Sequence, residues 1–233
     1  MKSALKIPLL IVAIGAASSA FSASTNLIVN ATIGNPQPPA VSIRYFVGNN
    51  LAGGTVAFNL GGKSSTGATD TYWGGISTLQ DAPTKFSDFS QLNAMGAVEI
   101  YDSGDTGLIQ FSSIKLSAND DAELVGKTHT SQKISAKVYG AANTVDQSEI
   151  TFDPKGLGNA LPPSYYQNLE AEGVVPLSGS PTYSISSANQ SKAIILPVAI
   201  LGEATNTDVG SWSMDSFKGQ LTITVTPTFT NVL

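Results

Sequence analysis

Few residues in this sequence could carry out catalysis. It has one histidine, His129, and no cysteine. One histidine cannot build a multi-histidine metal site, and nothing in the sequence places a serine and an acid beside it to form a triad. The absence of cysteine excludes a thiol nucleophile and thiolate metal ligands. We therefore expect His129 to be an ordinary surface residue on a polar run that leads into a strand.

Two short motifs resemble functional sites only in part. Gly62-Lys63-Ser64 resembles the end of a phosphate-binding loop, but the glycine needed five residues earlier is replaced by Ala57, inside an expected strand. Ser112 and Lys115 have Ser-x-x-Lys spacing, yet the companion motifs Ser-Asp-Asn and Lys-Thr-Gly are missing. Both matches are interpreted as chance.

An acidic cluster is the remaining candidate for a metal site. Asp120, Asp121 and Glu123 carry the oxygen ligands that calcium prefers, but they lack the spacing of an EF-hand, and a solvated turn is the simpler interpretation. We therefore expect no metal, no cofactor and no enzymatic activity. A hydrolase that uses two carboxylates is the alternative that the sequence leaves open.

Several aromatic residues lie in polar, loop-like contexts. They are Tyr72, Trp73, Trp212 and the pair at 165–166. Exposed aromatic rings can stack on sugars, so Tyr72, Trp73 and Trp212 are candidate glycan contacts. The alternative, which we favour, is that these rings cover the ends of a hydrophobic core.

The start of the chain has the three parts of a secretory signal. Two lysines precede an apolar run at 7–17, and Ala20 and Ser22 occupy the −3 and −1 positions that a signal peptidase needs. The run is shorter than the roughly 20 apolar residues of a membrane-spanning helix. We expect residues 1–22 to be removed and the exported chain to begin at Ala23.

The composition suits a secreted β protein. Of the 12 basic residues two fall in the signal, which leaves 10 against 17 acidic residues and a net charge of −7. Such an acidic chain is a poor partner for nucleic acid. Charged residues make up only 12% of the chain, about half of the ~25% typical of globular domains. A domain of this size can bury a sufficient core without disulfides.

Short segments with period-2 alternation, separated by turns rich in Gly, Asn, Asp and Ser, predict many strands. One such turn is expected at Gly61-Gly62. Strands are expected at 41–47, 54–60, 97–101, 108–116, 132–139, 148–152, 182–187, 193–201 and 219–229.

Two segments have helical spacing. These are 86–92 and 162–170, the second with Ser164 as a helix cap. Both are expected as insertions between strands. With no alternation of strands and long helices, residues 37–233 are predicted to form one all-β domain, a β-sandwich with short helical insertions.

The segment after the signal is the most informative. Its alternation places Leu27, Val29, Ala31 and Ile33 on one face, and a proline-rich break follows from Pro36. As an isolated strand it would expose an apolar face and an open edge, which is an association site. We expect residues 23–36 to have no partner in their own fold and to add as a strand to another subunit's sheet.

The two ends of the chain resemble those of chaperone–usher fimbrial major subunits. Asn26–Pro36 is similar to the N-terminal extension of alpha-clade, colonisation-factor-type pilins, with an early Asn, alternating apolar residues, a central Ala and an early Pro. Ser216–Val225 is similar to their closing strand, an aromatic-x-Gly followed by alternating apolar residues. Common-pilus pilins end in a similar way. The resemblance covers only these two end segments.

This resemblance implies an incomplete immunoglobulin-like sandwich that a donor strand completes. A periplasmic chaperone would fill the gap first. At the outer-membrane usher, Leu27, Val29, Ala31 and Ile33 of the next subunit would replace it, with Ala31 permitting close approach. The implied product is a cell-surface fimbria, a polymer of this chain that supports adhesion to a host glycan or protein receptor.

The chain also departs from related pilins. It lacks the cysteine pair of type 1-like subunits, has no penultimate Tyr, and is longer than the usual alpha-clade subunit. The extra length leaves room for a binding surface. A secreted carbohydrate-binding β-sandwich or a tip adhesin is therefore the alternative function.

Overall fold

A computed structural model describes most of the chain between residues 22 and 229. The described residues are 22–31, 41–48, 50–51, 55–66, 69–74, 82–89, 94–102, 111–119, 122–142, 151–152, 156, 158–162, 164–186, 193–205 and 216–229. Only the backbone is described in five of the strands bounded below, namely β1, β3, β4, β5 and β10. Of the predicted signal at 1–22, residues 1–21 lie outside this description, and Ser22 is the first residue of β1.

Strands dominate the described structure. The first eight are β1 (Ser22–Ala31), β2 (Val41–Val47), β3 (Asn50–Leu51), β4 (Thr55–Thr66), β5 (Thr69–Gly74), β6 (Met95–Asp102), β7 (Phe111–Ala118) and β8 (Ala122–Gly126). The others are β9 (Lys133–Ala141), β10 (Thr151–Phe152), β11 (Val174–Pro176), β12 (Thr182–Ser184), β13 (Ala193–Thr205), β14 (Ser216–Lys218) and β15 (Gln220–Phe229). The short helices are η1 (Phe86–Asp88), α1 (Tyr165–Asn168) and η3 (Leu177–Gly179). The all-β prediction is confirmed.

Most expected strands are present, and β2 has the predicted bounds. The turn expected at Gly61-Gly62 is wrong. β4 continues through it to Thr66, with a register irregularity between Leu60 and Gly62. The polar strand β5 was not predicted, because its residues show no apolar alternation and only pairing with β4 and β13 defines it.

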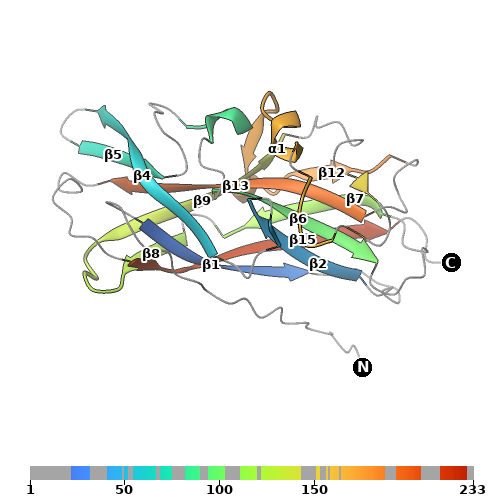
Figure 1. Ribbon diagram of the computed structural model, residues 1–233, viewed down its shortest axis with the longest axis horizontal. Helices are drawn as coiled ribbons and strands as arrows, with labels where there is room; N and C mark the ends of the chain where they lie inside the picture. The colour runs from blue at the N-terminus through green and yellow to red at the C-terminus, as the bar shows by residue number, and fades with distance from the viewer. Residues whose placement is uncertain are drawn as a thin grey trace.

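The strands form two facing sheets that run along the long axis of the molecule (Figure 1). One has the order β3-β2-β6-β13-β9-β11, and the other β12-β7-β15-β1-β4. At the end that carries β4, β5 and β8 the sheets join, since β9-β8-β14-β1-β4-β5-β13 closes back on β9. A closed ring leaves no open strand edge at this end.

The core lies between the sheets and follows the predicted alternation. On β15, Leu221, Ile223 and Val225 are fully buried, whereas the threonines between them are half-buried. On β9, Ile134 and Ala136 are likewise buried. Each buried Leu, Ile or Val side chain contributes roughly 1.5–3 kcal/mol when it leaves water.

The helical segments lie together in an outer layer above β9 and β13 (Figure 1). The N–H of Phe86 donates to the carbonyl of Glu172 (3.0 Å), and the N–H of Val174 donates to that of Thr84 (2.9 Å). The ring of Phe89 packs against Tyr139 of β9 with centroids 5.8 Å apart. The two insertions are thus confirmed, and their described helical residues are 86–88 and 165–168.

The cap expected at the start of α1 is only partly correct. Ser164 occupies the N-cap position, but its side chain makes no capping hydrogen bond. Instead its carbonyl accepts the N–H of Asn168 (3.1 Å). The helix is held by packing, since Tyr165 and Tyr166 are both buried.

Candidate functional site: the slot that holds the first strand

β1 lies between the last strand and β4 (Figure 1). Asn26–Ala31 pairs in parallel with Gln220–Val225 of β15, and the first two residues of β1 pair in parallel with β14. On the other side, Ser22–Asn26 pairs antiparallel with Thr55–Asn59 of β4. We call the position between β14–β15 and β4 the first-strand slot.

The expectation that this segment has no partner in its own fold is therefore wrong. Leu27, Val29 and Ala31 stand in register opposite the three buried residues of β15 described above. The period-2 pattern predicted the strand, but local alternation cannot tell whether the partner belongs to the same chain. Ile33 lies outside the described residues.

The C-terminal strand changes partner at Gly219. Before it, β14 pairs with β8, and after it β15 pairs with β7. A Cβ at Gly219 would collide with the carbonyl oxygen of Glu123 and would lie 2.5 Å from Cδ2 of Leu124. The aromatic-x-Gly pattern noted in the sequence therefore has a physical reason here: Phe217 is fully buried, and Gly219 admits the backbone of β8.

Asn119 fills the interval between the two partners. Its Oδ1 accepts the N–H of Thr222 (2.5 Å), and its Nδ2 donates to the carbonyl of Gln220 (3.2 Å). Its own N–H donates to the carbonyl of Thr222 (3.1 Å). As a result, the edge of the C-terminal strand that faces away from β1 is hydrogen-bonded along its length. β8 pairs with β14, Asn119 bonds to Gln220 and Thr222, and β7 pairs with the rest of β15.

The slot is suited to holding an extended strand. β1 makes eight register pairs with the C-terminal strand, two with β14 and six with β15. If β1 left, this row of backbone groups would become an open edge beside a buried apolar wall. Such an edge is a template for another strand.

The other candidate residues are not brought together. His129 lies in the turn between β8 and β9, where its carbonyl accepts the N–H of Gln132 (2.9 Å). Gly62-Lys63-Ser64 lies within β4, and Ser112 and Lys115 lie on β7. Among the described residues no group of three or more His, Cys, Asp or Glu could hold a metal ion.

The acidic cluster does not form a turn throughout, because Glu123 belongs to β8 and forms an ion pair with Lys133 at 3.0 Å. Asp120 and Asp121 lie outside the described residues. Of the candidate glycan contacts, Tyr72 and Trp73 belong to β5, which is described by its backbone, and Trp212 lies outside the description.

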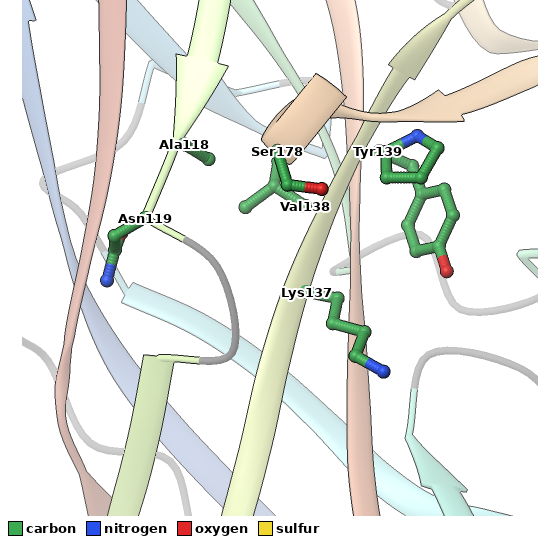
Figure 2. Close-up of a pocket in the computed structure, with 7 residues that line it drawn as sticks. Ala118, Asn119, Lys137, Val138, Tyr139 and Ser178 are labelled. Atoms are coloured by element: carbon green, nitrogen blue, oxygen red, sulfur yellow. The ribbon is translucent and has the colours of Figure 1, made fainter. Parts of the chain in front are cut away.

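A pocket of about 220 Å³ lies where the edge partner of β9 changes from β8 to β11. Figure 2 shows Asn119 and Lys137 on opposite sides of it. Lys137 forms an ion pair with Glu203 at 3.1 Å, and the amide of Asn119 is engaged on β15. The pocket is also below the ~300 Å³ typical of ligand sites, so we do not assign it a ligand.

In the described part of the chain, no helix is long and apolar enough to cross a membrane. No family model matches this sequence, and no curated protein matches it either.

Proposed function

We propose that this chain is the structural subunit of a surface fimbria, in which subunits join by exchanging their N-terminal strands. The observation that carries the proposal is that a terminal strand, β1, fills a slot between β15 and β4. Residues 32–40, which include three prolines, join it to β2. A terminal strand on such a connection can leave its slot without unfolding the remainder of the chain.

Exchange preserves the interactions that β1 makes. A slot emptied by its own strand presents the same row of backbone groups and the same apolar wall to the strand of a second copy. Domain swapping of this kind is a low-cost route to assembly, and it becomes an open polymer when each copy donates to the next. The sequence patterns at both chain ends, similar to those of chaperone–usher pilins, support the same proposal.

The proposal includes the partners that the resemblance implies. A periplasmic chaperone would protect the slot after export, an outer-membrane usher would organise the exchange, and the finished fimbria would support adhesion.

The test uses the exported chain from Ala23 and a variant lacking residues 23–35. The full chain should form detergent-resistant multimers on gels and by size-exclusion chromatography. The deletion variant should not assemble alone, but it should bind a synthetic peptide of residues 23–35, because its slot is intact. Added to growing multimers, it should cap them. Assembly of the deletion variant at the rate of the full chain would contradict the proposal.

Two single substitutions supply a matched control. Val29→Glu places a charge opposite the buried residue Ile223, whereas Asn30→Glu places it opposite the half-buried Thr224. Burying an unpaired charge is costly. Val29→Glu should therefore suppress assembly at least tenfold more than Asn30→Glu does.

A further inference from the structure

The orientation of β1 distinguishes it from the other strands. Its pairings with β14 and β15 are parallel, whereas every other strand pairing in the described residues is antiparallel. Parallel pairing is slightly less stable per residue than antiparallel pairing. On the side of β14 and β15, β1 is therefore held by the less stable type of strand pairing.

The two halves of β1 are held unequally. All of Ser22–Asn26 pairs with β4 on one side, and on the other side Ser22 and Ala23 pair with β14 and Asn26 pairs with β15. In Leu27–Ala31 the described pairing is with β15 alone. The second half should therefore separate from the sheet before the first.

From these features we infer that the free subunit is capped by its own β1, which must withdraw before the slot accepts the strand of a second copy. This inference rests on the proposed function and adds a regulatory step to it. The slot has room for one strand, so occupation by the subunit's own β1 and by another copy's β1 exclude each other.

Tethering gives the subunit's own strand an advantage. A strand joined by a short connection has an effective concentration in the millimolar range. At lower subunit concentrations its own β1 holds the slot, and spontaneous polymerisation is slow. A factor that captures β1 during its withdrawal, or a nucleus that offers many strands at once, would accelerate assembly.

The absence of native cysteine allows a direct test. Asn30 stands opposite Thr224 in the parallel register, so the pair Asn30→Cys and Thr224→Cys should form a disulfide within one chain under mild oxidation. The matched control is Asn30→Cys with Gln220→Cys, four residues away and thus about 13 Å out of register. In dilute subunit, the first pair should cross-link at least tenfold faster than the control, at a rate independent of protein concentration.

The oxidised Asn30–Thr224 subunit should also be locked. It should bind a labelled peptide of residues 23–35, and assemble, at least tenfold more slowly than its reduced form, and reduction should restore both rates. Unchanged assembly of the oxidised subunit would overturn the inference.

The outcomes separate the two proposals. Multimers that require residues 23–35, with no faster cross-linking than in the control, would overturn the capped state and leave strand exchange standing. A second outcome is rapid cross-linking under oxidation in a subunit whose reduced form never forms multimers. It would overturn the proposed function, and with it the regulatory step, but it would still support the parallel pairing of β1 with β15.

Discussion

Glu99 lies on β6 with its side chain fully buried, and Arg44 on β2 balances its charge. Nε and Nη2 of Arg44 lie 2.7 and 2.6 Å from Oε2 of Glu99. The guanidinium also lies over the ring of Tyr101, 4.4 Å from its centroid. Gly156, at φ 79°, leaves the space beside the other carboxylate oxygen, because a Cβ there would lie 2.5 Å from Oε1. The pair thus ties β2, which follows the proline-rich connection, to β6.

Removing one partner of this pair should destabilise the fold strongly. Arg44→Met leaves Glu99 without its cation in a buried site, and we expect a loss of about 3 kcal/mol in the free energy of unfolding, measured by urea denaturation. Adding Glu99→Gln to the same chain should recover part of the loss. The exposed pair Lys133–Glu123 is the control, because both side chains are 54% accessible, and Lys133→Met should cost less than about 1 kcal/mol. Equal effects at the two pairs would contradict this account.

Gly219 permits the change of partner within the C-terminal strand. Gly219→Ala would drive its new Cβ into the backbone of β8, and we expect a loss of about 1–3 kcal/mol, in the range of overpacked cores. The control is Gly158→Ala, since a Cβ there would have no atom within 4 Å. If urea denaturation gave both variants the same stability, the close approach of β8 would not be the reason for glycine at position 219.

At the scale of elements, the outer layer depends on a few local polar contacts. Oδ2 of Asp88 accepts the backbone N–H groups of Thr84 (2.8 Å) and Lys85 (2.9 Å) and the Thr84 hydroxyl (3.3 Å). Burial raises the pKa of Asp88, but these hydrogen bonds and the charge of Lys85 outweigh it and hold the pKa below its ordinary value of 3.8. The carboxylate therefore stabilises the start of η1 in its ionised form.

This contact should make the layer sensitive to acid. A carboxyl whose pKa is lower in the folded state adds stability above its unfolded value, and that stability is lost as the pH falls through the folded value. Asp88→Asn should therefore lower stability by about 0.5–1 kcal/mol at neutral pH. The difference from wild type should disappear well below pH 3.8. Amide exchange at Thr84 and Lys85 reports the same loss locally, whereas Ser87→Ala, an exposed neighbour, should change neither measurement.

At the scale of the whole molecule, buried tyrosines connect the layers. The hydroxyl of Tyr166 donates to the carbonyl of Gly48 (2.7 Å), and that of Tyr183 donates to the carbonyl of Ala141 (2.7 Å). Burial raises the pKa of Tyr45, Tyr166 and Tyr183 above their ordinary value of 10.0, and at Tyr166 the neighbouring tyrosines add to the effect. Each hydroxyl is thus neutral in the folded protein at a pH where it ionises in the unfolded chain.

Stability should consequently fall in alkali. Below pH 10.0 these three tyrosines do not make the free energy of unfolding depend on pH. Above it, the free energy of unfolding declines as the pH rises through their raised folded pKa values. Three such groups give a slope of up to about 4 kcal/mol per pH unit. Urea denaturation across this range, with phenolate absorbance, measures it. Tyr45→Phe should reduce the slope by about a third with little effect at neutral pH, because the buried Tyr45 hydroxyl has no hydrogen-bond partner among the described residues. Ionisation of all 7 tyrosines near pH 10 in the folded state would contradict the prediction.

Local alternation in the sequence predicted many of the strands and, on β15, which face is buried. Leu221, Ile223 and Val225 alternate with threonines, and this local pattern is sufficient because side chains on a strand alternate between its two faces. The same alternation located β1, and helical spacing located the two insertions.

The neighbours of each strand follow from tertiary contacts and not from local patterns. The parallel pairing of Asn26–Ala31 with Gln220–Val225 joins residues from opposite ends of the chain, and nothing in either segment specifies the other's orientation. β5 and β8 became strands through their partners, and Asn119, at the end of β7, continues the ladder on β15 with its side chain. Pairing is set by non-local backbone hydrogen bonds and by the shape of the core, which no short window of sequence contains.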